Sequence, residues 1–180
     1  SSKAGGGIKG RMFAWSANQA RTFSVASEKT FGPGLFKKMR HGIADALVLK
    51  KIRSVLGPNL RYIVSGGAPL ATDLAHFYAG MGITLIQGYG LSETTGPISV
   101  QHIGKNPVGG VGLPLPGNFI KIAKDGEILV RGQSVMPGYY HLPEQTAEVM
   151  PDGKWFHTGD LGSIDRKGQL TITGRKKELI

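Results

Sequence analysis

The chain has 180 residues, is 40% hydrophobic and carries a formal net charge of +10. This composition can form a sizeable core and excludes a chain that is disordered by composition. The absence of cysteine excludes disulfides, a thiol nucleophile and thiolate zinc sites. The five histidines show no metal-ligand spacing such as HExxH, and the sequence has no run of about 18 apolar residues that could span a membrane.

The first 55 residues are strongly basic and are expected to be mostly helical, with a break at 31–34. They hold 11 Lys and Arg against two acidic residues, giving +9, whereas the remaining 125 residues hold 11 against 10, giving +1. This charge could attract acidic lipid head groups or ligand phosphates and so allow peripheral contact with a membrane. A solvated helical face is the simpler interpretation, and we favour it. No base-reading motif accompanies the charge, so nucleic acid is not expected as a partner.

A strand, glycine turn, helix, strand and second glycine turn are expected between residues 60 and 97. Residues 60–64 are typical of a buried strand, 70–79 have apolar side chains at helical spacing, and 83–86 form a second short apolar run. The order predicts a parallel βαβ unit with a right-handed crossover. Both glycine turns would then lie at the carboxyl ends of neighbouring strands, where open α/β sheets bind ligands.

The second glycine turn, QGYGLSETTGP at 87–97, carries the most chemistry. Its glycines let the backbone approach a ligand closely, and its tyrosine offers a face on which a base could stack. Its hydroxyls could reach phosphate oxygens, and its carboxylate is a hard ligand suited to Mg²⁺. A turn without function is the competing interpretation. The glycines are Gly88 and Gly90, and the tyrosine is Tyr89. The hydroxyls belong to Ser92, Thr94 and Thr95, and the carboxylate belongs to Glu93.

Short strands alternate with turns from Val108 onward, which predicts a small distorted barrel or sandwich. The Asp-Gly turn at 125–126 joins two strand-like runs and favours a hairpin. Asp160 could accept hydrogen bonds from vicinal ribose hydroxyls, and the guanidinium of Arg175 could bind phosphate or ribose oxygens. Taken singly, each has a simpler explanation as a turn residue and a surface cation. The predicted division is 1–107 for a helical and α/β part and 108–180 for a β-rich part.

Together, these stretches resemble the adenylate-forming superfamily of acyl-CoA synthetases, beetle luciferases and peptide-synthetase adenylation domains. The resemblance covers about two-thirds of the chain and is closest to bacterial long- or medium-chain fatty acyl-CoA synthetases. It implies an α/β fold, with a parallel βαβ unit, flanking helices and a distorted β-barrel, as part of the large N-terminal domain. The matching stretches are SGGAPL (65–70), QGYGLSETTGP (87–97), GEILVRGQSVMPGYY (126–140), WFHTGDLG (155–162) and ITGRKKELI (172–180).

The resemblance also implies a role for each matching residue. The first glycine loop would border adenine and the acyl carbonyl, and Tyr89 would lie against adenine. Ser92 stands where the family usually has a threonine that contacts the α-phosphate, and Glu93 would hold Mg²⁺. Lys177 would be the hinge about which a small C-terminal domain rotates. The implied nucleotide-binding residues are Gly66, Gly67, Ala68, Pro69, Gln87, Gly88, Tyr89, Gly90, Thr94, Asp160 for ribose and Ile172 beside adenosine. The implied catalytic residues are Glu93, Ser92, Arg175 and Lys177.

The reaction implied is an AMP-forming acid–thiol ligation. A fatty acid carboxylate would attack ATP to give acyl-AMP and pyrophosphate, and the thiol of coenzyme A would then displace AMP. The implied cofactors and partners are ATP, Mg²⁺, coenzyme A and the fatty acid. The protein would position these reactants and neutralise charge on the phosphates. The expected location is the cytoplasm, with peripheral contact at the inner face of the membrane as a further option.

Two parts of the family pattern are not in this sequence: the upstream phosphate-gripping loop and the C-terminal domain with its catalytic lysine. The chain is therefore expected to be an internal piece of a longer synthetase that binds adenosine weakly by itself. One alternative is an acyl-AMP ligase or adenylation domain that loads a carrier-protein thiol, and another is a non-catalytic nucleotide- or acyl-binding module. A dinucleotide-binding oxidoreductase is excluded, since Glu93 stands where GxGxxG requires its last glycine.

Overall fold

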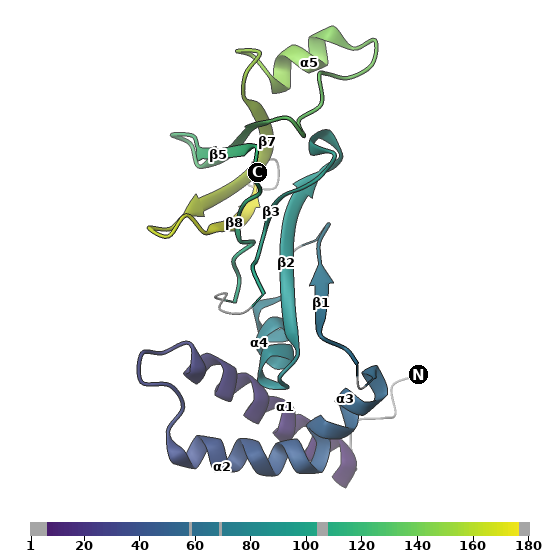
Figure 1. The fold of residues 1–180 in the computed structure, drawn as a ribbon, viewed down its shortest axis with the longest axis vertical. Helices are drawn as coiled ribbons and strands as arrows, with labels where there is room; N and C mark the ends of the chain where they lie inside the picture. Colours follow the sequence, from purple (N-terminus) through teal and green to yellow (C-terminus); the bar gives the residue numbers. More distant parts are fainter. Residues whose placement is uncertain (1–6, 58, 69, 104–107, 177–180) are drawn as a thin grey trace. The chain divides into compact units, whose positions relative to one another are not determined.

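The computed structural model describes residues 7–57, 59–68, 70–103 and 108–176 (Figure 1). The chain forms two compact units and passes between them three times. Two of these boundaries fall within strands β1 (Tyr62–Ser65) and β2 (Thr84–Leu91). The helical unit is Ser1–Ile63 with Leu70–Leu85, and the sheet unit is Val64–Pro69 with Ile86–Ile180.

Helices make up most of the helical unit, and two of them pack very closely. A Cβ at Gly80 in α4 would collide with the backbone of Ala20 in α1, so only glycine allows this approach. Met81, Leu49 and Ile83 join Ala20 in the core of this unit. The elements are α1 (Ile8–Ser27), α2 (Leu35–Ala44), the π-helical turn η1 (Asp45–Leu49), α3 (Lys50–Leu56) and α4 (Thr72–Gly80).

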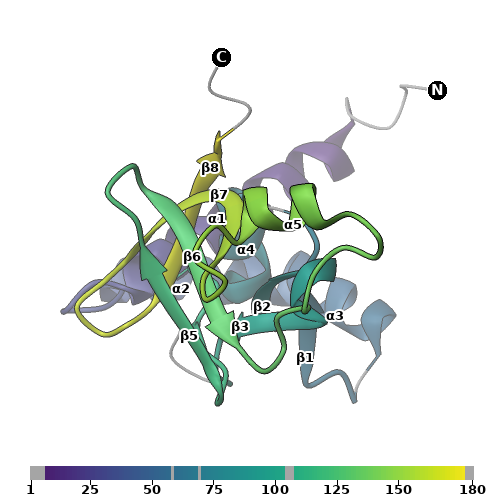
Figure 2. The same cartoon turned by 90° about the horizontal axis from the view of Figure 1, so that it is seen from above.

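Two four-stranded sheets follow in the chain. The first has the order β1-β2-β3-β4, with β3 (Gly96–Val100) antiparallel to β2 and β4 (Leu113–Pro114) antiparallel to β3. The second is antiparallel throughout and runs in the order β5-β6-β7-β8. Figure 2 shows β5 and β6 side by side and running in opposite directions. The remaining elements are β5 (Asn118–Ile122), β6 (Glu127–Gly132), α5 (Pro143–Val149), β7 (Phe156–Ile164) and β8 (Leu170–Arg175).

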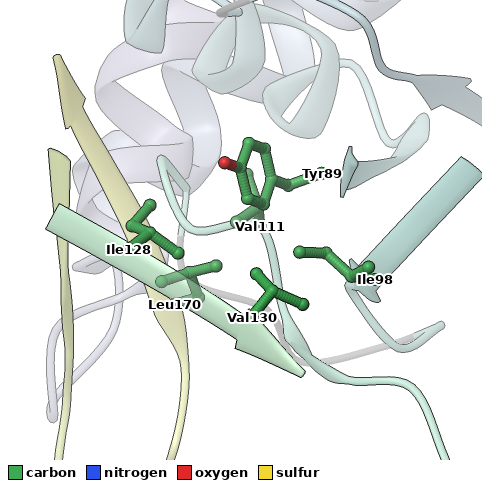
Figure 3. Close-up of a cluster of buried hydrophobic side chains, with 6 residues drawn as sticks. All are labelled: Tyr89, Ile98, Val111, Ile128, Val130 and Leu170. Atoms are coloured by element: carbon green, nitrogen blue, oxygen red, sulfur yellow. The ribbon is translucent and has the colours of Figure 1, made fainter. Parts of the chain in front are cut away.

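The core of the sheet unit joins its two sheets (Figure 3). Tyr89 and Ile98 come from β2 and β3, whereas Ile128 and Val130 come from β6 and Leu170 from β8. Each fully buried aliphatic side chain of this kind contributes about 1.5–3 kcal/mol to folding. The same core therefore fixes the end of β2 against the second sheet, and both carry predicted site residues.

The α/β class predicted from the sequence is confirmed. The strand predicted at 60–64 is β1, the helix predicted at 70–79 is α4, and the Asp-Gly hairpin is the β5–β6 pair. The prediction that this first strand is buried is wrong, because exposed and partly buried residues alternate along β1. The curled antiparallel sheet β5–β8 is a half-barrel, in agreement with the predicted small distorted barrel. The parallel orientation of β1 and β2, the right-handed crossover and the domain boundary after residue 107 stay predictions.

Candidate nucleotide-binding site

The stretch 87–97, predicted to be one tight turn, is a strand followed by a short turn and a second strand. β2 continues through Leu91, a 3₁₀ turn covers Ser92–Thr94, and β3 begins at Gly96. A Cβ on Gly90 would collide with the backbone of Gly96, so this glycine serves close strand packing. The prediction of a single turn is wrong because pairing with β3 extends the strand β2 through Gly88 and Gly90.

Thr94 holds the short turn together from the inside. It is fully buried, and its hydroxyl accepts a hydrogen bond from Leu91 N at 2.9 Å and donates to Gly96 O at 2.8 Å. Thr95 follows with a left-handed backbone, φ 54°, and its hydroxyl donates to a loop carbonyl. The predicted phosphate contact of Thr94 is at odds with this inward geometry. Ser92 is exposed, so its hydroxyl remains the candidate for the phosphate.

Glu93 is held by the segment that follows β6. The Tyr139 hydroxyl donates to Glu93 Oε1 at 3.0 Å, and Met136 N donates to Glu93 O at 2.7 Å. Burial and the neighbouring carboxylate raise the pKa of Tyr139, which therefore stays a donor at neutral pH. Tyr139 was not among the predicted site residues, although it lies in the GEILVRGQSVMPGYY stretch.

Asp160, Tyr89 and Arg175 form a hydrogen-bonded cluster in the sheet unit, in which Tyr89 and Asp160 are buried and the Arg175 side chain is 60% exposed. The Tyr89 hydroxyl donates to Asp160 Oδ2 at 2.6 Å, and Arg175 Nε donates to Asp160 Oδ1 at 3.0 Å. Asp160 and Arg175 are also partners in the β7–β8 ladder. Burial, with the hydrogen bond to Asp160, raises the pKa of Tyr89 far above its ordinary value. The structure thus brings together Tyr89 and Asp160, which are 71 positions apart in the sequence, and Asp160 and Arg175, which are 15 positions apart.

Glu127 lies next to this cluster and is buried, with only 4% of its surface exposed. Its carboxylate accepts hydrogen bonds from Gly159 N at 2.9 Å and from Lys176 Nζ at 3.0 Å, and His157 Nδ1 lies 3.1 Å away. Burial raises its pKa, but these partners outweigh that effect and leave the pKa below its usual value. Glu127 was not among the predicted site residues. It is the first residue of β6, and its hydrogen-bond partners lie 30 to 49 positions away, so no local sequence pattern indicates them.

The first glycine loop lies against the end of β2. A Cβ on Gly66 would sit 3.5 Å from Gly88 O, and Gly67 has a φ of +78°. Gln87 is buried, and its backbone N–H donates to the side-chain oxygen of Gln101 at 2.9 Å. The two glycine segments are therefore neighbours, as the sequence predicted, and the backbone of Gly66, Gly67 and Ala68 is exposed beside them.

The family model for AMP-binding enzymes matches residues 18–140 of the sequence, which is more than half of the chain. The chain belongs to the AMP-binding enzyme family. The predicted resemblance to adenylate-forming enzymes is thereby confirmed.

Curated relatives of this chain include proteins named as long-chain fatty acid ligases. The long-chain-fatty-acid–CoA ligase FadD15 of Mycobacterium bovis is 51% identical over 172 residues, which are 96% of this chain and 28% of that protein. Long chain acyl-CoA synthetase 1 of Arabidopsis thaliana is 41% identical over 156 residues, which are 77% of this chain and 23% of that protein. The chain therefore spans about a quarter of the length of these relatives.

Solved structures share the AMP-binding fold with this chain. A Mycobacterium tuberculosis fatty acyl CoA synthetase has a TM-score of 0.60 and 29% identity, over 72% of this chain and 28% of that one. The O-succinylbenzoate coenzyme A synthetase MenE from Bacillus subtilis, in complex with ATP and magnesium ion, has a TM-score of 0.59 and 30% identity. The match covers 73% of this chain and 31% of that one.

Glu93 is the predicted Mg²⁺ ligand, and its carboxylate is of the type that would hold this ion. Mg²⁺ commonly takes one or two protein carboxylates and completes its coordination with substrate phosphates and water. Within the described ranges, no three or more His, Cys, Asp or Glu gather as a metal site. A single half-buried carboxylate, oriented by Tyr139, suits a metal that arrives with a nucleotide.

Three further predictions concern residues near the candidate site. Ile172 packs against the core of the sheet unit, partly buried, which is compatible with an apolar neighbour of adenosine. Pro69 and Lys177 lie outside the described residues, so the predicted loop proline and hinge lysine stay predictions. Across the described part of the chain, no helix has the length and apolar character needed to cross a membrane.

Replacing Tyr89 with phenylalanine is expected to lower the free energy of unfolding by about 1–2 kcal/mol, because a buried carboxylate oxygen loses its donor. Tyr140→Phe is the matched control, since Tyr140 is 87% exposed. Urea denaturation followed by circular dichroism measures both variants. Equal stability of Tyr89→Phe and Tyr140→Phe would show that the Asp160 contact contributes nothing.

Acidification is expected to destabilise the sheet unit through Glu127. Its pKa in the folded chain lies below the ordinary value of 4.5, so its stabilisation is complete above that pH and is lost as the pH falls through the folded pKa. The free energy of unfolding should therefore fall below about pH 4.5 more steeply in the wild type than in Glu127→Gln. Glu144→Gln, at an exposed position in α5, should keep the wild-type slope. A Glu127→Gln profile parallel to that of the wild type would contradict the assignment.

Proposed function

We propose that this sequence belongs to an AMP-forming fatty acid–coenzyme A ligase. The observation that carries the proposal is the cluster of Tyr89, Asp160 and Arg175, which lies in the same unit as the Glu93 turn. A buried carboxylate beside a guanidinium offers acceptors and donors for vicinal ribose hydroxyls. The 51% identity to a long-chain-fatty-acid–CoA ligase supports the choice of substrate class.

The first half-reaction makes the carboxylate a better acyl donor. A carboxylate oxygen of the fatty acid attacks the α-phosphorus of ATP, the bond to the β-phosphate oxygen breaks, and pyrophosphate leaves with that electron pair. Asp160 and Arg175 hold the ribose, and the exposed Ser92 hydroxyl donates to an α-phosphate oxygen. Mg²⁺ supplies charge neutralisation on the phosphates when bound, and Glu93 is the residue that would hold it. The protein contributes mainly positioning and electrostatic stabilisation.

The second half-reaction transfers the acyl group to a thiol. The thiol gives its proton to solvent and its sulfur attacks the acyl carbon of acyl-AMP. The thioester C–S bond forms, the bond between the acyl carbon and the phosphate oxygen breaks, and AMP leaves with that electron pair. Coenzyme A is the proposed acceptor because the relatives are named as coenzyme A ligases. A carrier-protein thiol is the competing acceptor.

A calorimetric titration tests the adenylate site in this chain. Two non-hydrolysable acyl-adenylate analogues are compared, one with an acetyl and one with a palmitoyl group. Tighter binding of the palmitoyl analogue supports both the adenylate site and the long-chain substrate. Equal binding supports the adenylate site and rejects the long-chain choice. The proposed function is rejected if two results are found together. The folded chain binds neither analogue, and a protein that contains this sequence and is as long as the relatives shows no ATP–pyrophosphate exchange.

The acceptor is tested in that longer protein. After preformation of palmitoyl-AMP, release of AMP is followed with coenzyme A and, separately, with a phosphopantetheinylated carrier protein. Release of AMP with coenzyme A supports the ligase. Release with the carrier protein alone assigns the chain to the acyl-AMP ligases.

Peripheral membrane contact and a cytoplasmic location belong to the same proposal. α2 exposes Leu35, Met39 and Ile43 at a spacing of four residues, and the same helix carries Lys37, Lys38 and Arg40. Apolar side chains with flanking cations suit the surface of an anionic bilayer. Sedimentation of the full-length protein with phosphatidylglycerol vesicles, but not with phosphatidylcholine vesicles, would support this contact.

A further inference from the structure

Strand β7 leaves regular pairing with β6 where Asp160 lies, although Asp160 still pairs with Arg175 of β8. The register with β6 passes from Leu129↔His157 to Glu127↔Leu161, so a two-residue step on β6 faces a four-residue step on β7. The segment between these pairs therefore bulges out of the ladder. A bulge leaves backbone N–H groups without ladder acceptors, and a buried donor is costly unless another group accepts from it.

Side chains accept from the two N–H groups at the centre of this bulge. Gly159 N donates to Glu127 Oε1 at 2.9 Å, and Asp160 N donates to Thr158 Oγ1 at 3.1 Å. Gly159 has a φ of +73°, a conformation that favours glycine. The backbone directly before Asp160 is thus tied to the Glu127 carboxylate.

The same carboxylate also reaches the end of β8. Lys176 Nζ donates to Glu127 Oε2 at 3.0 Å, and Lys176 directly follows Arg175 in the chain. The lysine has a second partner in Asp125 Oδ2, at 2.7 Å, whose side chain is 51% exposed. One buried carboxylate therefore contacts the neighbours of both Asp160 and Arg175.

We propose that Glu127 is a positioning residue that sets the spacing of Asp160 and Arg175 through Gly159 and Lys176. It touches neither reactant itself. The inference deepens the proposed function, since it takes the ligand of the pair to be the ribose of adenosine. Losing the anchor disturbs recognition of the nucleotide and leaves the fatty acid site unchanged.

Steady-state kinetics of the full-length ligase containing this sequence tests the proposal with Glu127→Gln, which keeps the shape and removes the charge. The KM for ATP should rise about tenfold, because hydrogen bonds to charged groups are the strong ones. The KM for the fatty acid and kcat should change by less than about twofold. Asp125→Asn is the matched control, because it removes the exposed partner of the same lysine and surface pairs contribute little. An equal rise in both KM values would overturn the proposal in favour of a general structural role.

A spectroscopic measurement on this chain separates the proposal from the proposed function. In ¹⁵N–¹H spectra, Glu127→Gln should shift both the Gly159 amide and the Arg175 Nε–H signals, whereas Asp125→Asn should leave the Gly159 signal in place. This result stands even if the chain has no affinity for nucleotides, in which case only the proposed function fails. A shift at Gly159 without one at Arg175 would overturn the proposal.

Lys176→Met provides a second route if Glu127→Gln does not fold, since Lys176 is half-exposed and its loss leaves Glu127 its Gly159 contact. This variant alone should raise the KM for ATP a few-fold. When both variants fold, the double variant should show less than the sum of the two effects, because the two residues act in one contact. Additive effects would overturn the coupling.

Discussion

Replacing Gly90 with alanine is expected to destabilise the sheet unit by about 3 kcal/mol, which is the upper range for overpacking. A Cβ at this position collides with the backbone of Gly96 and Pro97, and backbone cannot move aside as a flexible side chain can. The β2–β3 pairing would have to open at Leu91↔Gly96, the base of the turn that carries Glu93. Because whole domains are stable by only about 5–15 kcal/mol, the loss should be plain in urea denaturation.

Gly174→Ala is the matched control for this variant. Gly174 also lies in a strand of the sheet unit, but a Cβ there would meet nothing within 4 Å. Its free energy of unfolding should stay within about 0.5 kcal/mol of the wild type. Nucleotide binding should be lost in Gly90→Ala at temperatures where Gly174→Ala still binds. Equal stability of the two variants would mean that β2 and β3 do not approach as closely as the structure shows.

Replacing Glu93 with glutamine is expected to lower the rate of adenylation about 100-fold in the full-length enzyme, the size of loss seen when one electrostatic contact to a transition state is removed. The amide keeps the oxygen that accepts from Tyr139, so the turn should remain folded. It lacks the negative charge that a hard cation prefers. The Mg²⁺ concentration for half-maximal pyrophosphate exchange should therefore rise.

Tyr139→Phe separates orientation of Glu93 from its charge. This variant keeps the carboxylate and removes the hydroxyl that donates to it at 3.0 Å. The expected loss of rate is smaller, about tenfold, and higher Mg²⁺ should recover part of it. Glu144→Gln, on exposed α5, should match the wild type at every Mg²⁺ concentration. Unchanged pyrophosphate release by Glu93→Gln at limiting Mg²⁺ would remove Glu93 from the metal site.

Local patterns predicted the elements that carry the site. The apolar run at 60–64 and the helical spacing at 70–79 correspond to β1 and α4, and the Asp-Gly turn closes the β5–β6 hairpin. These features depend on residues close in sequence, where turn chemistry and hydrophobic period act directly. The same local rules misled at 87–97, because glycines that suggest a turn serve close packing between β2 and β3.

The sequence by itself determined which side chains are candidates for the chemistry: Glu93, Asp160 and Arg175 stand out by type and motif, and their roles stay predictions. Tyr89 was predicted to lie against adenine, but this residue is only 7% exposed and packs in the core of the sheet unit. Only the tertiary structure decided how they are held. Tyr89 reaches Asp160 across 71 positions, Tyr139 reaches Glu93 across 46, and Lys176 reaches Glu127 across 49. Such partners depend on strand register and on bulges, since a shift of one residue turns every side chain to the opposite face. Register is fixed by packing of the whole sheet unit, which no local stretch of sequence contains.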